Sequence, residues 1–318
     1  MDELRRQVAR VARSKARTVL IYGETGTGKG LVARMLHEQS DRAARPFVDI
    51  NCAAIPTALL ESELFGHEKG AFTGAVGRKQ GLIEAAAGGT VFLDEVRELD
   101  PVMQAKILTL LDTGRMRRVG GVTPSEVDVR FIAATNRILL TEVNEGRFRD
   151  DLYYRLQVIA LNLPPLRERG DDILLLAGGF LEHYNAVHGS RFRRLDDAVR
   201  RVFRAYAWPG NVRELENLIE RICLLEDGEV VRIEHLPQRI VRDTPAGALL
   251  AARAVPPGSA GRGARPAGFH AATLEFQRAL VAEALATADG NLARAAAALG
   301  LTRHALRHQM GKLGLLDG

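Results

Sequence analysis

The sequence predicts an α/β protein in which a parallel sheet with a phosphate-binding loop is followed by a helical subdomain and a small all-α domain. Three observations support this. Short apolar runs alternate with longer amphipathic ones over residues 1–165, a glycine-rich loop follows the first apolar run, and a helical period replaces the alternation after residue 170. At roughly 150 residues per domain, 318 residues leave room for about two domains.

Five short runs, rich in β-branched and apolar residues, have the pattern of strands. Each run is bounded by glycine, proline or polar turn residues. Near-continuous apolar strands separated by helical segments indicate a parallel sheet that is covered on both faces. The predicted strands span residues 18–22, 46–51, 90–93, 129–134 and 158–163.

The pattern changes to helices after the last predicted strand. Residues 171–184, 196–206 and 211–225 have helical periodicity and acidic first turns, and we expect no strand between them. These features predict an α/β subdomain over residues 1–170 and a helical subdomain over residues 171–240.

A linker and a third domain follow. Residues 241–270 contain 8 Ala, 5 Gly and 4 Pro without periodicity, which predicts a flexible linker. Beyond it, residues 274–288, 291–299 and 302–313 predict three short helices of a domain over residues 271–318, with a tight turn between the last two.

The composition excludes several classes of protein. The chain is 46% hydrophobic and 26% charged, which is the balance of a globular chain. No apolar run approaches the roughly 18 residues that span a bilayer, and the N-terminus is charged where a secretory signal is apolar, so we expect no membrane contact. Cys52 and Cys223 lie in apolar contexts without metal-ligand spacing. We therefore expect two reduced core thiols in a cytoplasmic protein.

A phosphate-binding loop follows the first predicted strand. Backbone N–H groups of such a loop wrap phosphate oxygens, and its lysine reaches the β- and γ-phosphates. The Ser or Thr that usually follows the lysine and binds magnesium is a glycine here. A glycine-rich turn without a ligand is the alternative, which the order of strand, loop and helix disfavours. The candidate nucleotide-binding residues of the loop are Gly23, Glu24, Thr25, Gly26, Thr27, Gly28, Lys29 and Gly30.

Two acidic residues, Asp94 and Glu95, end the third predicted strand. The carboxyl edge of a parallel sheet faces the phosphate loop, so Asp94 is the candidate ligand for Mg²⁺ and Glu95 the candidate group that polarises the attacking water. Two acids after a strand are, by themselves, typical of a solvated strand end. In a chain that also has a phosphate loop, they predict hydrolysis of ATP with Mg²⁺ as cofactor.

A six-residue signature, GAFTGA, gives the chain a specific resemblance. It consists of Gly70, Ala71, Phe72, Thr73, Gly74 and Ala75. By these residues the chain resembles the AAA+ activators of sigma-54 RNA polymerase, also called bacterial enhancer-binding proteins, from about residue 11 to 236 and again in the C-terminal helices. The resemblance implies an AAA+ P-loop sheet with a helical lid, and a Fis-type helix-turn-helix at the C-terminus.

The resemblance also implies roles for single residues. Phe72 and Thr73 would form a protruding tip that touches sigma-54, although a buried loop aromatic is an alternative for Phe72. Asn51 resembles the asparagine that holds the catalytic glutamate in an inactive pose until nucleotide is sensed. Asn136 resembles the first sensor residue, and Arg213 resembles the second sensor, on the lid. Residues 112–121 are similar to a second pore-side loop.

Arg149 and Arg155 resemble arginine fingers that reach into the site of a neighbouring subunit. A transferring phosphoryl group needs cationic stabilisation, and an arginine supplied in trans would explain assembly of a ring, which we expect to be a hexamer. Surface ion pairs with Asp150 and Asp151 are the alternative.

The last predicted helix has the pattern of a DNA-recognition helix. Thr302 is a plausible N-cap, and Arg303, Arg307 and, less closely, Lys312 share one side of the helix, which suits a major groove. A solvated basic face on a packing helix is the alternative. The resemblance implies enhancer DNA as the target. The candidate DNA-binding residues are Thr302, Arg303, His304, Arg307, His308 and Lys312.

Taken together, these features predict an ATP-hydrolysing transcriptional activator that remodels the closed complex of sigma-54 RNA polymerase holoenzyme. Gly30 and Arg97 depart from the family pattern, and they motivate the alternative of a DNA-binding regulator with a weakly hydrolytic core. An AAA+ remodeller of some other protein is a third possibility. Because the resemblance begins almost at Met1, we expect either a regulatory protein that acts in trans or a truncated form.

Overall fold

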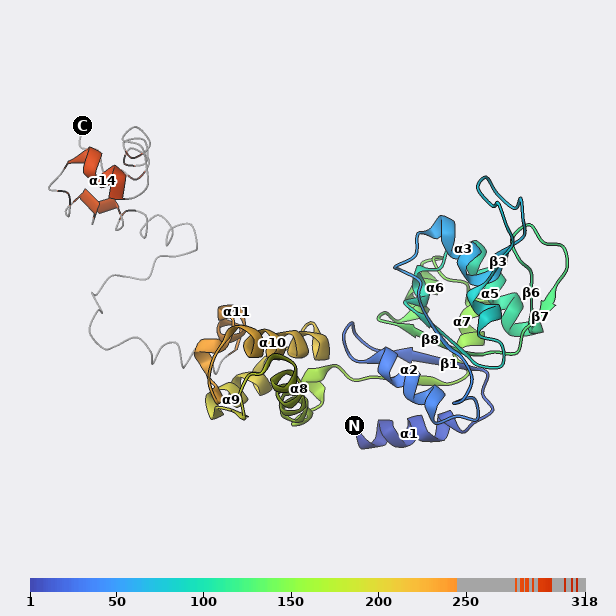
Figure 1. Cartoon of the computed structure of the whole chain (residues 1–318), viewed down its shortest axis with the longest axis horizontal. Helices are drawn as coiled ribbons and strands as arrows, with labels where there is room; N and C mark the ends of the chain where they lie inside the picture. Colours follow the sequence, from blue (N-terminus) through green and yellow to red (C-terminus); the bar gives the residue numbers. More distant parts are fainter. Residues whose placement is uncertain are drawn as a thin grey trace. The chain divides into compact units, whose positions relative to one another are not determined.

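The computed structural model describes residues 1–244, residues 291–298 and nine single positions between 278 and 313 (Figure 1). The chain forms two compact units, Met1–Ala254 and Val255–Gly318. Most of the predicted linker lies outside the described residues. So do all six candidate DNA-binding residues: Thr302, Arg303, His304, Arg307, His308 and Lys312.

A five-stranded parallel sheet forms the centre of the first unit, with the strand order β2-β5-β8-β1-β9. All five predicted strands are present, and their ends differ from the predicted ones by no more than two residues. The strands are β1 (Thr18–Tyr22), β2 (Phe47–Asn51), β5 (Thr90–Asp94), β8 (Arg130–Thr135) and β9 (Ala160–Asn162).

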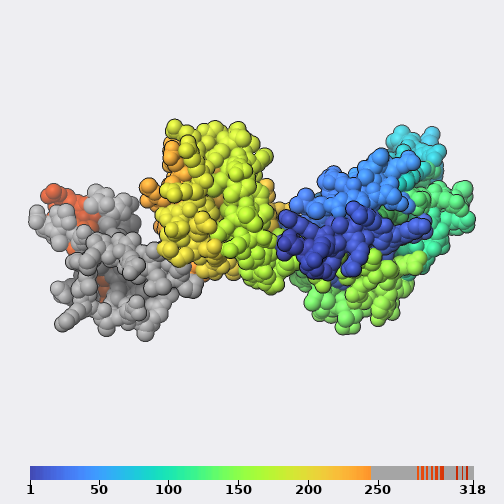
Figure 2. Space-filling model, turned by 90° about the horizontal axis from the view of Figure 1, so that it is seen from below, coloured from blue at the N-terminus to red at the C-terminus, as the bar shows by residue number. Residues whose placement is uncertain are grey.

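The strands are apolar throughout because helices cover both faces of the sheet. Successive side chains point to opposite faces, so Leu20 packs in one cluster of buried side chains and Ile21 in another. The Ile21 cluster includes residues of α1 (Asp2–Ala12) and α2 (Lys29–Glu38), and α1 is the dark blue surface segment in Figure 2. The Leu20 cluster includes residues of α3 (Thr57–Phe65), α4 (Leu82–Ala85), α5 (Pro101–Thr113), α6 (Leu139–Asn144) and α7 (Asp150–Leu156).

Two short antiparallel pairs lie outside the main sheet. The pair β3 (Gly66–His67) and β4 (Lys79–Gln80) brackets the GAFTGA segment. The pair β6 (Arg115–Met116) and β7 (Ser125–Glu126) encloses residues 117–124, whereas the second loop was predicted over residues 112–121, of which the first two end α5. A β-bridge between His67 and Val119 joins the two loops at their bases.

A helical subdomain with its own core follows the sheet. Its core includes Phe192, Phe203, Trp208 and Ile219, all of which are fully buried. The helices are α8 (Asp172–His188), α9 (Asp197–Ala205), α10 (Asn211–Leu225) and α11 (Gln238–Arg242). The 3₁₀ turns of the first unit are η1 (Val96–Glu98), η2 (Leu166–Glu168) and η3 (Ile233–His235).

Two sequence-based expectations for this subdomain are corrected. A parallel pair, β10 (Arg194–Leu195) and β11 (Val230–Val231), lies between helices where no strand was expected. Two-residue strands are too short to produce a recognisable alternation, which explains why the sequence does not reveal them. In addition, α11 runs to Arg242, two residues into the range predicted as linker.

The second unit is described at few positions. Helix α14 (Leu292–Ala298) lies within the helix predicted over residues 291–299. Leu306 and Leu313 of the last predicted helix are both buried in a small apolar cluster with Ala295 and Met310. None of the helices in the described part of the chain is long and apolar enough to cross a membrane.

Candidate functional site

The phosphate-binding loop connects β1 to α2. Gly26 and Gly28 have left-handed φ values of 79° and 97°, which glycine adopts without steric cost. The Lys29 side chain is buried, and its Nζ donates hydrogen bonds to the carbonyls of Gly23, at 3.0 Å, and Glu24, at 3.3 Å. The lysine therefore lies folded over the loop whose glycines let the backbone turn tightly.

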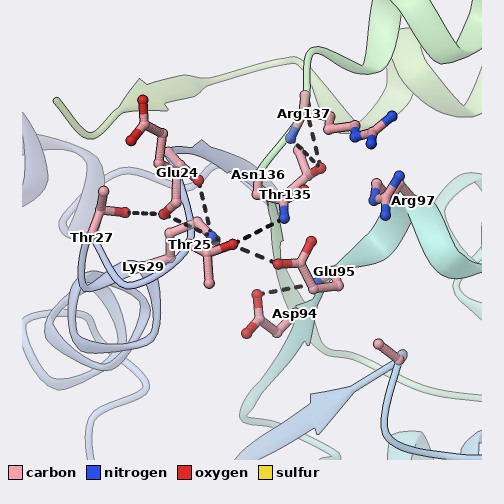
Figure 3. Close-up of polar contacts among 12 residues, drawn as sticks. Glu24, Thr25, Thr27, Lys29, Asp94, Glu95, Arg97, Thr135, Asn136 and Arg137 are labelled. Carbon is pink, nitrogen blue, oxygen red and sulfur yellow. Dashed lines mark hydrogen bonds and ion pairs between the residues drawn. The ribbon is translucent and has the colours of Figure 1, made fainter. Parts of the chain in front are cut away.

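The acidic pair lies directly across from the loop (Figure 3). The Glu95 N–H donates to Asp94 Oδ1 at 3.0 Å, and Glu95 Oε1 lies 3.9 Å from Lys29 Nζ. Glu95 has a φ of 51°, a left-handed conformation that is uncommon for a residue with a side chain. Its second carboxylate oxygen, Oε2, is buried without a hydrogen-bond partner.

Asn136 lies beyond the end of β8, next to the acidic pair. Its Nδ2 donates to Thr25 Oγ1 of the loop at 3.1 Å (Figure 3). Its Oδ1 is buried without a partner, as is Glu95 Oε2. Buried polar atoms almost always have partners, so two unsatisfied oxygens at one site indicate that water or a bound group completes it.

The donor set fits a magnesium ion that is bound together with a nucleotide. Among the residues that the structure describes, no three metal-binding side chains lie together. Mg²⁺ commonly takes only one or two protein carboxylates and completes its shell with phosphate oxygens and water. Asp94, with one oxygen committed to the Glu95 N–H, can supply such a carboxylate.

Asn51 ends β2 beside Asp94, its partner in the strand register. Its Oδ1 accepts a hydrogen bond from the Ala53 N–H at 3.0 Å. No hydrogen bond joins Asn51 to Glu95 in the part of the chain that is described. Its expected role of holding the catalytic glutamate stays a prediction.

The two predicted arginine fingers lie at opposite ends of α7, Arg149 as its N-cap and Arg155 in its last turn. Arg149 makes a two-pronged ion pair with Asp151, at 3.0 and 2.7 Å. Arg155 donates to the Leu111 carbonyl at 3.0 Å and pairs with Asp112 at 3.0 Å. Both side chains are 45% exposed. The described residues contain no hydrogen bond or ion pair from either arginine to the phosphate-binding loop or to the acidic pair of the same chain.

The lid contacts the loop through the first turn of α10. The Val212 N–H donates to the Gly26 carbonyl at 2.9 Å, and the Arg213 N–H approaches the same oxygen at 3.4 Å. A Cβ atom on Gly26 would lie 2.3 Å from the Gly210 carbonyl oxygen, so only glycine allows this approach. A cavity of about 480 Å³ at this contact is lined by Thr25, Arg213 and other lid residues.

Three lid-side residues that sequence reasoning missed also contact the loop. Asn211 is fully buried, and its Nδ2 donates to Glu24 Oε2 and to the Thr25 carbonyl. Arg167 and Arg169 bind Glu24 and the Thr27 carbonyl, respectively. Because these partners are more than 140 residues apart along the chain, no local pattern points to them.

The GAFTGA segment forms an exposed turn. Gly70 and Gly74 have left-handed φ values, and hydrogen bonds from Gly70 to Ala75 and from Ala75 to Phe72 close the loop. Phe72 is 42% exposed. Within the described chain its ring makes one aromatic contact, an edge-on contact with the ring of His67. The alternative of a buried loop aromatic is therefore wrong.

Arg97, which departs from the family pattern, forms an ion pair with Glu98 at 2.6 Å. Its Nε is buried without a partner, and the structure gives it no ion pair with Glu95. Gly30, the other departure, has room beside it, since an added Cβ would meet only Phe92 Cε1, at 3.8 Å.

Comparison with known families assigns a description to each part of the chain. Residues 1–162 match the sigma-54 interaction domain, residues 167–252 match the AAA+ ATPase lid domain, and residues 274–313 match the Fis family of bacterial regulatory proteins.

Curated relatives align along nearly the whole chain. The nitrogen fixation protein VnfA of Azotobacter vinelandii is 45% identical over 99% of the chain, which covers 58% of VnfA. The regulatory protein AtoC of Escherichia coli K12 is 43% identical over 99%, covering 66% of AtoC. The response regulator PilR of Pseudomonas aeruginosa is 44% identical over 99%, covering 68% of PilR. The chain thus spans between half and about two thirds of the length of these relatives.

A solved structure, NtrX from Brucella abortus, matches with a TM-score of 0.73 and 34% identity, covering 99% of this chain and 67% of NtrX. NtrX in complex with ADP matches with the same TM-score, 33% identity, and coverage of 98% and 67%. The fold is therefore shared with a protein whose structure has been solved in complex with ADP.

Proposed function

The chain belongs to the family of sigma-54-dependent transcriptional regulators, with an AAA+ domain and a Fis-type helix-turn-helix, and we propose that it is an ATP-hydrolysing activator that remodels the closed complex of sigma-54 RNA polymerase. The observation that carries the proposal is the pair of partnerless buried oxygens, Glu95 Oε2 and Asn136 Oδ1, beside Lys29 at the phosphate-binding loop. Bound water would supply the hydrogen-bond donors that these two acceptor oxygens lack.

The chemistry follows from the positions of the side chains. Lys29 would leave the carbonyls of Gly23 and Glu24 to bind the β- and γ-phosphates, where its charge offsets that of the phosphates. Glu95 Oε2 would accept a hydrogen bond from the attacking water and orient it. Asn136 would donate to the γ-phosphate through Nδ2, the atom that bonds to Thr25 Oγ1 in the structure. When bound through Asp94, Mg²⁺ would supply neutralising charge to the phosphate oxygens.

A complete site would need a second subunit. Since Arg149 and Arg155 contact neither the loop nor the acidic pair of their own chain, they would act on a neighbour's γ-phosphate, and a ring, a hexamer by family resemblance, would follow. Residues 271–318 would bind enhancer DNA through Thr302, Arg303, His304, Arg307, His308 and Lys312.

The ATPase test uses steady-state turnover per protomer over a range of protein concentrations. We expect the rate per protomer to rise cooperatively with concentration and to vanish in Glu95→Ala with ATP binding preserved. Glu98→Ala is the matched control, because Glu98 is a neighbouring acid that pairs with Arg97 and should be dispensable. Normal turnover in Glu95→Ala would overturn the catalytic assignment.

The polymerase test uses the exposed loop. Thr73→Ala should keep ATPase activity and lose open-complex formation on a sigma-54 promoter, because its position next to Phe72 puts it at the tip. Val76→Ala, at an 85% exposed position of the same loop, is the control. Unchanged transcription with Thr73→Ala would refute the loop assignment. The weakly hydrolytic alternative rests on Gly30 and Arg97. Gly30 has room beside it, and Arg97 forms its ion pair with Glu98.

A further inference from the structure

Every carbonyl of the phosphate-binding loop from residue 23 to 27 accepts a hydrogen bond. The first two bond within the loop region, to Lys29 Nζ and to the N–H and hydroxyl of Thr27. The next three bond to the lid and the segment leading into it. Thr25 O accepts from Asn211 Nδ2 at 3.0 Å, Gly26 O from the Val212 N–H at 2.9 Å, and Thr27 O from Arg169 Nη2 at 2.8 Å.

Most N–H groups of the same loop donate no hydrogen bond. In the described chain the N–H groups of Thr25, Gly26, Gly28, Lys29 and Gly30 donate no hydrogen bond, whereas the Thr27 N–H bonds to the Glu24 carbonyl. The C=O of one residue and the N–H of the next point in opposite directions across a trans peptide, and the chain has no cis peptide. Because Asn211 binds Thr25 O from the lid side, the Gly26 N–H points away from the lid donor and into the loop. Arg169 orients the Gly28 N–H in the same way by binding Thr27 O.

The donors on the lid side are themselves fixed. Asn211 is fully buried with a φ of 52°, and its Oδ1 accepts from the Leu166 N–H at 2.7 Å. Its Nδ2 also donates to the Glu24 carboxylate, which accepts hydrogen bonds from Nη1 and Nη2 of Arg167 at 3.0 and 2.7 Å. The hydrogen bonds from Arg167 and Asn211 hold the pKa of Glu24 below its ordinary value, so the carboxylate stays ionised at neutral pH.

Arg169 is anchored in the same way. Its Nε donates to the Pro164 carbonyl at 3.0 Å while Nη2 reaches Thr27 O. The side chain of Asn211 cannot rearrange without breaking three hydrogen bonds, and that of Arg169 cannot do so without breaking two. The lid side thus offers the loop two rigid donors, and each determines the direction of one peptide plane.

We propose that Asn211 and Arg169 are positioning residues of the phosphate site, which from the lid side aim the N–H groups of Gly26 and Gly28 at the phosphates of ADP or ATP. The inference rests on the proposed nucleotide binding at this loop. It assigns the lid a role that does not depend on the γ-phosphate, because loop N–H groups bind the inner phosphates that ADP and ATP share. Arg213, as a sensor, would instead discriminate ATP from ADP.

The test is calorimetric titration of the full chain with ADP and with a non-hydrolysable ATP analogue. Asn211→Gly removes the side chain but keeps a residue that tolerates positive φ, and Arg169→Met removes the guanidinium but keeps the apolar stem. Each variant loses one hydrogen bond to a loop carbonyl, so we expect Kd to rise about three- to tenfold for both nucleotides equally. Arg169→Lys should restore part of the loss, and Arg204→Met, which breaks a lid ion pair with Asp171 away from the loop, should change nothing.

Trp208, the single tryptophan, reports whether the lid stays folded, since it is fully buried three residues before Asn211. If the fluorescence emission maximum of Trp208 stays at the short wavelength of a buried tryptophan in the variants, the lid has not unfolded. If Asn211→Gly opens the lid, the Arg169 variants decide the question. Unchanged Kd values with a folded lid, or a rise for the ATP analogue alone, would overturn the inference. A wild-type chain that binds neither nucleotide would instead overturn the proposed function.

Discussion

The guanidinium of Arg118 donates to both carboxylate oxygens of Glu84, at 2.7 and 2.8 Å, and to Glu68 at 2.9 Å. Arg118 lies just after β6, Glu84 is in α4, and Glu68 begins the loop that carries Phe72. The Arg118 side chain is only 13% exposed, and the hydrogen bonds to Glu84 and Glu68 raise its pKa above the ordinary value. One cation therefore ties both surface loops to the body of the sheet subdomain.

Replacing Arg118 should release the Phe72 loop. In Arg118→Gln we expect faster amide hydrogen exchange over residues 66–80, because the half-buried carboxylate of Glu84 loses its partner and Glu68 loses its anchor. The exposed pair of Arg115 with Glu126 offers a matched control, Arg115→Gln, that should leave this segment unchanged. Equal exchange in the two variants would mean that the loop is held by its own turn and the bridge at Val119.

Gly30→Ala should stabilise the protein. Gly30 lies in the first turn of α2 without a positive φ, and the added methyl group would make an ordinary contact with Phe92 at 3.8 Å. Alanine at a compatible helical position gains roughly 0.4 to 1 kcal/mol over glycine. Urea unfolding should show a higher midpoint with an unchanged slope. Gly26→Ala, where the Cβ would meet the Gly210 carbonyl at 2.3 Å, should instead lower the midpoint.

The sheet was predictable because each strand is a local apolar run that helices cover on both faces. Residues 18–22 were predicted with the observed ends, and the acidic pair after β5 follows from strand polarity. The exposure of Phe72 also follows from its glycine-rich neighbours. These are properties of short contiguous segments, in which the pattern and the burial have the same cause.

The contacts of the lid with the loop were not predictable in the same way. Asn211 binds Glu24 across 187 residues, and Arg169 binds Thr27 across 142. Neither residue differs in type from an ordinary helix cap or surface cation, so only the tertiary fold reveals its function. The two-residue strands β10 and β11 likewise exist only as a pair, joined through tertiary contacts.

The arginine fingers can be tested by mixing two inactive variants. Glu95→Ala keeps its arginines and lacks the catalytic carboxylate, whereas Arg155→Ala keeps its own site and lacks the finger. If Arg155 acts on a neighbour, mixed rings contain some complete sites, and ATPase activity should return from a level about 10³-fold below wild type. If Arg155 acts on its own chain, no mixture forms a complete site and the activity stays at the level of the separate variants. Asp112→Asn, which removes the resting partner of Arg155, should leave turnover within about twofold.

Arg97→Ala should leave ATP turnover within about threefold of wild type. Arg97 pairs with the adjacent Glu98, and together with Arg147 and Arg137 it lies near enough to Glu142 to help hold the pKa of that buried carboxylate below its ordinary value. Since Arg147 is the largest of these influences, the loss of Arg97 should be tolerated. A more than tenfold increase in steady-state ATPase activity would show that Arg97 restrains Glu95, and a comparable decrease would make it part of the catalytic site.

His37 should make the stability of the first unit depend on pH. The ring is buried between α2 and the sheet, where Nδ1 lies 2.9 Å from Thr90 Oγ1 and the ring packs against Phe47. Burial lowers the pKa of His37 below its ordinary value of 6.5, so the folded state favours the neutral ring. The unfolded chain binds the proton first as the pH falls, and stability is therefore lost below about pH 6.5.

The size of this loss is bounded by linkage. At pH 5.5, one unit below the ordinary pKa, His37 can remove at most about 1.4 kcal/mol from the free energy of unfolding. Between pH 8.0 and 5.5, urea unfolding should show a larger loss of the free energy of unfolding in wild type than in His37→Gln. The glutamine keeps a polar group near Thr90 but cannot bind the proton. His183→Gln, at an exposed position of α8, should retain the wild-type difference. If His37→Gln loses as much stability as wild type between the two pH values, other groups cause the acid sensitivity and the buried ring of His37 has no part in it.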